Sequence, residues 1–226
     1  VLVSKRSFWT LSFGAACSSM MGYGLFAWLP AYFVRSHGES LTEALAWLPG
    51  FMHLEGASPL LYAGYFYGTI VLFGGLIGIW GGGFLADKLG GAKKSAYALV
   101  PAIAFLCTAP FFAFGLLSDN ILVQFVIFLI PTALGLAWLG PVLSAFQHIV
   151  PPNMRATASA VFLLINNLIG IGLGDLLIGI MSDSLRVQFG DESLRYSILA
   201  GTSFYLIASL LFFISSRMLE KDWERG

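Results

Sequence analysis

Long apolar runs alternate with short polar connections along the whole chain. The runs are 8–34, 61–85, 95–117, 121–150, 156–181 and 198–218. A helix needs about 20 mainly apolar residues to cross the hydrocarbon core of a bilayer. Strands of a membrane barrel are shorter and alternate apolar with polar residues, which these runs do not. The pattern therefore predicts an all-α membrane protein with six transmembrane helices.

The composition agrees with a chain that lies in lipid. Of the 226 residues, 58% are hydrophobic and only 11% are charged, and the mean hydropathy is +0.82. A water-soluble domain is not this apolar. Because 12 basic residues balance 12 acidic ones, nothing suggests a nucleic-acid partner. Membrane lipid is the expected surrounding.

The basic residues predict which side of the membrane each connection faces. Nine of the 12 lie at the ends of the chain or in alternate connections: Lys5, Arg6, Lys88, Lys93, Lys94, Arg155, Arg217, Lys221 and Arg225. Arg35, Arg186 and Arg195 lie on the other side. Cytoplasmic connections carry the excess of Lys and Arg. We therefore expect both termini in the cytoplasm of a multi-pass protein of the cell membrane, inner or plasma.

The connection 36–60 is then extracytoplasmic. Leu41, Leu45 and Leu48 recur in it at helical spacing, and Trp47 suits a membrane interface. A short helix that lies on the membrane surface is expected there.

A charged segment between the second and third runs reads Gly83-Phe84-Leu85-Ala86-Asp87-Lys88-Leu89-Gly90-Gly91-Ala92-Lys93-Lys94. Its glycines predict a tight turn that reverses the chain. In this position Asp87 can cap helix ends or pair with Arg155 on the neighbouring connection. Such a pair would be a gate latch, made in one conformation and broken in another. The alternative is an ordinary acid that only fixes the topology.

Three regions together resemble the major facilitator superfamily, in its spinster-like branch. Gly22-Tyr23-Gly24-Leu25-Phe26-Ala27-Trp28-Leu29-Pro30 is similar to the family's seventh helix, and Gly83-x-x-x-Asp87-Lys88-x-Gly90 is similar to its cytoplasmic signature. Val150-Pro151-Pro152-Asn153-Met154-Arg155-Ala156, which continues into Asn166-Asn167, is similar to the start of its eleventh helix.

The resemblance implies that residues 1–226 are the C-terminal six-helix half of a twelve-helix transporter, whose N-terminal half is missing. It also implies two inverted three-helix repeats, which the matching Gly83-x-x-x-Asp87 and Gly179-x-x-x-Asp183 support weakly. Two departures stand out. Gly91 and Ala92 separate the signature from its lysines, and Asp175 stands where the family has a proline.

Candidate cavity residues follow from depth in the membrane. At about 1.5 Å per residue from Ala156, Asn166 and Asn167 lie near the membrane midplane, where such carriers bind cargo. Neighbouring residues point about 100° apart, so we expect one asparagine to face the cavity and the other to bond a neighbouring helix. Ser19 and Tyr23 share a face at i and i+4. Trp138 is either a cavity wall or plain packing.

Asp175 is an ionisable group within an apolar run, which makes it a possible proton site. Gly172-Leu173-Gly174-Asp175 also matches the Gly-x-Gly-Asp motif of intramembrane aspartyl proteases. Those enzymes need a second aspartate in a Tyr-Asp pair, and the chain has no Tyr-Asp. We therefore expect no enzyme, no metal site and no cofactor. Cys17 and Cys107 read as packing residues.

The predicted function is secondary active transport of a small organic or amphipathic solute, lipid-like or an organic anion, by alternating access with proton coupling. The predicted gate consists of Gly83, Asp87, Lys88, Gly90 and Arg155. The alternative is a passive channel or an assembly subunit.

Overall fold

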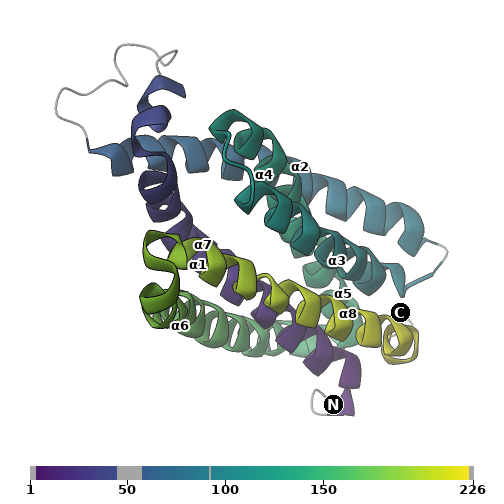
Figure 1. Cartoon of the computed structure of the whole chain (residues 1–226). Helices are drawn as coiled ribbons and strands as arrows, with labels where there is room; N and C mark the ends of the chain where they lie inside the picture. Colours follow the sequence, from purple (N-terminus) through teal and green to yellow (C-terminus); the bar gives the residue numbers. More distant parts are fainter. Residues whose placement is uncertain (1–3, 45–57, 92, 224–226) are drawn as a thin grey trace.

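The computed structural model describes residues 4–44, 58–91 and 93–223, and every regular element in these ranges is helical. The long helices run side by side as rods (Figure 1). Their bounds are α1 Arg6–Ala44, α2 Pro59–Gly90, α3 Ala96–Leu116, α4 Ile121–Leu136, α5 Leu139–Ile149, α6 Arg155–Phe189, α7 Ser193–Gly201 and α8 Ser203–Asp222, with short 3₁₀ turns at Pro152–Met154 and Gly190–Glu192.

The all-helical membrane fold that the apolar runs predict is confirmed. Four stretches of the described residues are long and apolar enough to cross a membrane: Pro59–Gly90, Ala96–Leu116, Ile121–Ile149 and Pro152–Asp222. The last of these contains α6, α7 and α8, and α1 is not among the four. The expected count of six spans is therefore only partly supported by length and composition.

Two predicted runs are interrupted helices. α4 and α5 meet at Ala137 and Trp138, and α7 and α8 meet at Thr202. Pro141 has no N–H to donate to the carbonyl of Ala137 four residues earlier, which accounts for the first break. At the second break the Thr202 hydroxyl donates to the Leu199 carbonyl at 2.7 Å.

The prediction of a tight turn at Gly83–Gly90 is wrong. These residues form the last two turns of α2, and the chain reverses only between Gly91 and Ser95. Gly90 instead provides room, because a Cβ atom there would press on the ring of Tyr97. The intervening Phe84-Leu85-Ala86 and Lys88-Leu89 are compatible with a helix, so these glycines did not mark a helix end.

The surface helix expected in 36–60 is only partly described. α1 continues beyond the predicted end of its run and contains a kink at His37, where φ is −139° and ψ is 23°. Leu41 is buried in the part after the kink. Leu45, Trp47 and Leu48 lie outside the described residues.

The rods form a closed sequence of neighbours. α1 packs on α8, α8 on α3, α3 on α4, α4 on α2 and α2 on α1, with α6 against α1. α2 and α4 meet through small residues, since a Cβ atom at Gly78 or Gly82 would strike the backbone of Ala133 or Ala137. Close backbone approach of this kind is typical of helix pairs in membranes.

The first and last helices are tied together at one end of the bundle, which we call the termini end. The Ser7 amide and hydroxyl donate to the Asp222 carboxylate at 2.9 and 2.7 Å, and the Lys5 ammonium donates to the Asp222 carbonyl at 2.8 Å. Figure 1 shows the N- and C-terminal segments at this end. We call the opposite end, with the turns after α3 and α6, the far end.

Large apolar side chains cover the outside of the rods. Trp80, Leu168 and Phe114 are 77%, 69% and 68% exposed. Exposing so much apolar area to water would be costly in free energy, whereas exposing it to lipid is not. The structure thus agrees with the hydropathy of the sequence.

Candidate functional site

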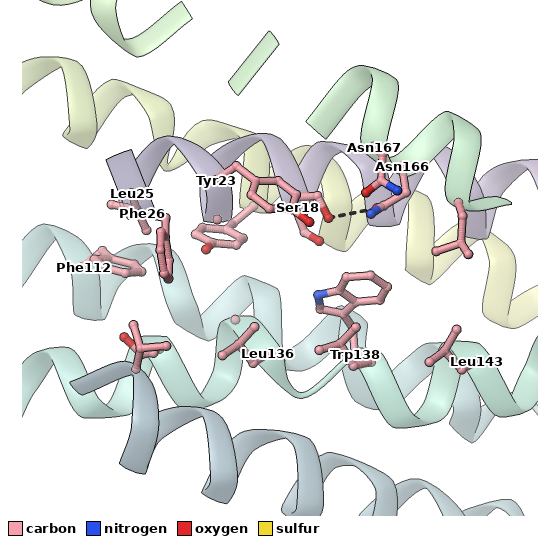
Figure 2. Close-up of a pocket in the computed structure, with 18 of the residues that line it drawn as sticks. Ser18, Tyr23, Leu25, Phe26, Phe112, Leu136, Trp138, Leu143, Asn166 and Asn167 are labelled. Carbon is pink, nitrogen blue, oxygen red and sulfur yellow. Dashed lines mark hydrogen bonds between the residues drawn. The ribbon is translucent and has the colours of Figure 1, made fainter. Parts of the chain in front are cut away.

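A cavity of about 360 Å³ lies between the helices in the middle of the bundle. It is within the range of ligand pockets, which starts near 300 Å³. Most of its lining comes from α1, α4, α5 and α6, with single contributions from α3 and α8 and two from α2. Figure 2 shows side chains from opposite helices that point toward one another across it.

One side of the cavity is polar. Ser18 and Ser19 of α1 and Asn166 and Asn167 of α6 line it. The Ser19 hydroxyl donates to Asn166 Oδ1 at 2.8 Å, which is the dashed line in Figure 2. Ser19 is 8% exposed and Asn166 6% exposed, whereas Asn167 is exposed. The expected division of roles is therefore not seen, because both asparagines line the cavity and Asn166 also bonds a neighbouring helix.

Close helix packing holds this polar pair together. A Cβ atom at Gly170 would meet Ser19, and one at Gly174 would meet the backbone of Met20. Small residues on α6 therefore let α1 approach closely enough for a direct side-chain hydrogen bond.

The rest of the cavity is apolar and aromatic. Phe26, Tyr67, Phe112 and Tyr205 line it. The Phe112 and Tyr205 rings stack with centroids 6.1 Å apart and an interplanar angle of 5°. Stacked rings of this kind form a rigid wall.

Trp138 is a wall of the same cavity (Figure 2). It stands at the break between α4 and α5, and its indole meets the Phe162 ring edge-on at 6.3 Å. Tyr23 also lines the cavity, as its spacing from Ser19 indicated. All five residues proposed from the sequence for the cavity thus lie around one space.

Charge is absent from this space. Among the described residues that line the cavity, none is Asp, Glu, Lys, Arg or His. The polar groups that this cavity offers are hydroxyl and amide groups and the indole N–H of Trp138.

Asp175 lies apart from the cavity, between α6 and α1. Its side chain is half-buried, and Oδ1 is buried without a hydrogen-bond partner among the described residues. The Trp28 indole donates to the Asp175 backbone carbonyl at 2.9 Å, so the aspartate is held against α1 by its backbone.

The proposed gate residues lie at the termini end. The Tyr97 hydroxyl donates to Asp87 Oδ1 at 2.9 Å. Within the described part of the chain, no salt bridge joins Asp87 to Arg155, and Arg155 Nε is buried without a hydrogen-bond partner. Lys88 is exposed, and Gly83 lies against Gly140 of α5.

A tryptophan connects this region to the end of α8. Trp223 stacks on His148 of α5 at 4.8 Å and meets the Tyr97 ring of α3 at 5.4 Å with a tilt of 31°. The Lys94 ammonium lies 5.5 Å from the Trp223 ring centroid. We call Tyr97, His148 and Trp223 the aromatic clasp. It joins the partner of Asp87 to two further helices.

The sequence did not single out Phe112, Tyr205 or Tyr67 as cavity residues. Tyr67 lines the cavity and is 8% exposed. It precedes Gly74, Gly78 and Gly82 at helical spacing, and this glycine stripe marks the packed face of α2. That spacing was the available signal for Tyr67. The pattern holds no equivalent signal for Phe112 and Tyr205.

Long apolar helices around an uncharged, partly polar central cavity define a membrane protein of the solute-carrier type. Residues 1–174 match the family model of the Major Facilitator Superfamily, and the chain belongs to that family. This confirms the resemblance seen in the sequence.

Two curated relatives match almost the whole chain. An MFS-type efflux pump of Mycolicibacterium smegmatis is 30% identical over 225 residues, which are 98% of this chain and 47% of that protein. Protein spinster homolog 3 of Danio rerio is 27% identical over 230 residues, which are 98% of this chain and 44% of that protein.

A solved structure of a bacterial homologue of the human lysosomal transporter spinster, inward-facing and unoccupied, has a TM-score of 0.79 at 27% identity. It matches 100% of this chain and 50% of its own. The chain is thus of the spinster type and spans about half the length of the curated relatives it matches.

Proposed function

We propose that this chain forms the C-terminal six-helix half of a secondary active transporter, which moves a small organic or amphipathic solute across a membrane by alternating access. The other half would be an N-terminal six-helix bundle, so that the cavity described here is one wall of the complete site. The proposal concerns the whole transporter, of which this chain supplies one side.

The observation that carries the proposal is the division of the cavity into a polar and an apolar part. An amphipathic solute would place its polar group against Ser19, Asn166 and Asn167. Its apolar body would lie along Phe112 and Tyr205. Because uncharged groups line this wall, any net charge on the cargo would be matched by the opposite half.

The gate is the second part of the proposal. Arg155 opens α6 at its N-terminus, where the helix dipole disfavours a cation and no acid lies in the first turn. A nearby carboxylate would relieve this cost, and Asp87 is the candidate. In this conformation Tyr97 holds Asp87 instead. We propose that the Asp87–Arg155 pair forms in the alternate conformation and closes the termini end.

Proton coupling is the third part. Asp175 has a half-buried carboxylate within an apolar helix, and its Oδ1 lacks a hydrogen-bond partner among the described residues. Ionisable residues within membrane helices mark proton pathways in transporters. We propose that protonation of Asp175 changes how tightly α6 packs on α1.

The central test is counterflow in liposomes that contain the complete transporter. The probes are radiolabelled lysophosphatidylcholine, sphingosine and the organic anion fluorescein, each preloaded unlabelled inside. A carrier accumulates the labelled probe transiently against its gradient, whereas a pore only equilibrates it. Equilibration without overshoot for a probe that passes would contradict the carrier.

A matched pair of variants tests the cavity. Asn166→Leu keeps the branched shape of the side chain and removes the hydrogen bond with Ser19, so we expect uptake to fall about tenfold, since a lost polar contact costs roughly 1–2 kcal/mol. Phe114→Leu changes an exposed side chain on α3 and should leave uptake unchanged. Equal uptake by both variants at equal expression would contradict the assignment of the cavity.

A further inference from the structure

A second group of polar side chains is buried at the far end of the bundle, away from the cavity. We call Tyr32, His37, Gln124 and Arg195 the far-end cluster. Tyr32 is 1%, His37 7% and Gln124 0% exposed. None of the four lines the cavity. Burial of so many polar groups in one place is costly unless they hold the structure or respond to something.

The cluster joins four segments of the chain. The Gln124 amide of α4 donates to the Tyr32 hydroxyl of α1 at 3.0 Å and to the Ser118 carbonyl at 2.6 Å. The Tyr32 hydroxyl donates to the Leu116 carbonyl at the end of α3 at 3.3 Å. The far end of α1 is therefore bound to the turn between α3 and α4.

Arg195 of α7 closes the cluster on the other side. Its guanidinium lies 5.9 Å from the centroid of the Tyr32 ring. It also pairs with Glu192 at 2.8 Å and with Asp119 at 3.7 Å. Arg195 thereby links the turn after α6 to the turn after α3.

His37 stands at the point where α1 bends. Its backbone leaves the helical region while the residues on both sides are helical. Its ring meets the Tyr32 ring edge-on at 6.4 Å. Within the described residues, His37 Nε2 and Gln124 Oε1 are both buried without a hydrogen-bond partner. A buried imidazole nitrogen without a hydrogen-bond partner disfavours the charged ring.

We propose that His37 is a proton-sensitive hinge, whose protonation breaks up the far-end cluster, through which Tyr32 binds α1 to the α3–α4 turn and to Arg195 of α7, and lets the part of α1 beyond the kink swing away. The neutral ring fits the buried position between Tyr32 and Gln124. The charged ring needs water, which it reaches only when the segment after His37 swings away. The non-helical backbone at His37 is the point about which the segment can turn.

The charges around His37 fix the direction of the effect. Burial lowers the pKa of His37, and the cation of Arg195 on α7 lowers it further. The Gln124 side chain of α4 and the carboxylates of Asp119 and Glu192 oppose this shift. Tyr32, on the same helix, is neutral in this range.

The sign follows from linkage. The released state has an ordinary histidine pKa of about 6.5, and the packed state has a lower one. The packed state is therefore fully stable above about pH 6.5 and loses stability as the pH falls from that value through its own, lower pKa. Acidification at the far end opens the hinge.

The test measures the hinge and needs no cargo, so its result is separate from that of the transport experiments. Spin labels are placed at Glu43, beyond the kink, and at Val187 on α6, both exposed. The complete transporter is studied in nanodiscs between pH 8 and 5, with Cys17 and Cys107 replaced. We expect the distance between the labels to lengthen with a midpoint below about pH 6.5.

His37→Gln should abolish this response, and His148→Gln, at the termini end, should leave it intact. A response that survives in His37→Gln, or no response in the parent protein, would overturn the hinge. Gln124→Glu provides a second readout if His37→Gln does not fold. The new carboxylate should stabilise protonated His37 in the packed state, so the midpoint should move to lower pH, and an unmoved midpoint contradicts the proposal.

Discussion

At the scale of single residues, Asp87 at the termini end contacts one group of side chains and is the proposed partner of another residue, Arg155. Asp87 accepts a hydrogen bond from Tyr97, and Tyr97 is in turn part of the aromatic clasp with Trp223 and His148. Arg155 lies at the start of α6 without a partner for its buried Nε among the described residues. In this conformation Asp87, the carboxylate proposed as the partner of Arg155, accepts a hydrogen bond from the neutral Tyr97 hydroxyl instead.

This arrangement gives a prediction for Asp87→Asn. Asparagine keeps the shape and still accepts from Tyr97, but it lacks the charge that Arg155 requires. We expect normal expression and a transport rate that falls about tenfold, which corresponds to about 1.4 kcal/mol, because Arg155 would have no carboxylate to pair with in the alternate conformation. Initial uptake rates in liposomes measure it.

Two further variants separate charge from hydrogen bonding. Tyr97→Phe removes the hydrogen bond and keeps the charge, so its rate should fall at most about threefold, as expected for about 0.5 kcal/mol. Asp183→Asn changes an exposed acid at the far end of α6 and should have no effect. If Asp87→Asn transports at the parent rate, the latch is wrong.

At the scale of elements, backbone contact between α2 and α4 sets the packing. Gly78 and Gly82 lie against the backbone of α4, and Gly140 lies against Gly83. These contacts place α2 and α4 so that Tyr67 and Thr132 both reach the cavity. α2 also carries glycines, such as Gly81, where an added Cβ atom would meet nothing within 4 Å. These positions allow a matched comparison.

We predict that Gly78→Ala destabilises the bundle and Gly81→Ala does not. The new methyl group at Gly78 would meet the backbone of Ala133, which has no room to move, so we expect a loss of about 1–3 kcal/mol. At Gly81 nothing lies within 4 Å, and alanine should gain up to about 1 kcal/mol of helix propensity. Thermal unfolding in one detergent compares the two. Equal melting temperatures would show that the close contact is not needed.

The sequence predicts the helical rods well and their interruptions poorly. Apolar runs must be helical in lipid, which leaves few alternatives for the fold. The break at Trp138 depends on Pro141, and nothing in the apolar pattern distinguishes it from Pro131, which is accommodated inside α4. The glycines near Asp87 were read as a turn because the pattern does not reveal that Tyr97 crosses Gly90.

The cavity was predictable only where depth and residue type agree. Asn166 and Ser19 are polar residues at mid-depth, where packing alone does not favour them. Phe112 and Tyr205 are aromatic residues in runs rich in aromatics, so only three-dimensional contacts distinguish them. The far-end cluster was not predicted from the sequence for a different reason. Its residues Tyr32, Gln124 and Arg195 come from distant parts of the chain.

At the scale of the whole molecule, the termini end and the far end differ in the polar and charged groups that they carry. The termini end holds Asp87, Arg155 and the aromatic clasp, and the far end holds His37 and Arg195. Alternating access requires that the two ends open in turn. Each end of this bundle therefore has its own polar groups, whose contacts can change when that end opens or closes.

The orientation of the bundle is a prediction at this scale. Lys93, at the termini end, should face the cytoplasm, and Asp119, at the far end, should face outward. In intact cells, a membrane-impermeant maleimide should label Asp119→Cys and not Lys93→Cys, in a background without Cys17 and Cys107. Both positions should react after the cells are permeabilised. Labelling of Lys93→Cys from outside would reverse the proposed orientation.

The hydrogen bonds of Asp222 to Ser7 have a consequence for biosynthesis. They join residues 215 positions apart, and α1 also packs along α8. The ribosome synthesises α8 long after α1 has entered the bilayer. Until then, the face of α1 that packs on α8 must be covered by lipid or by the insertion machinery. Nascent chains arrested before α8 should remain open to proteases and chaperones. The packing of α8 against α1 is then the final step in the assembly of the bundle.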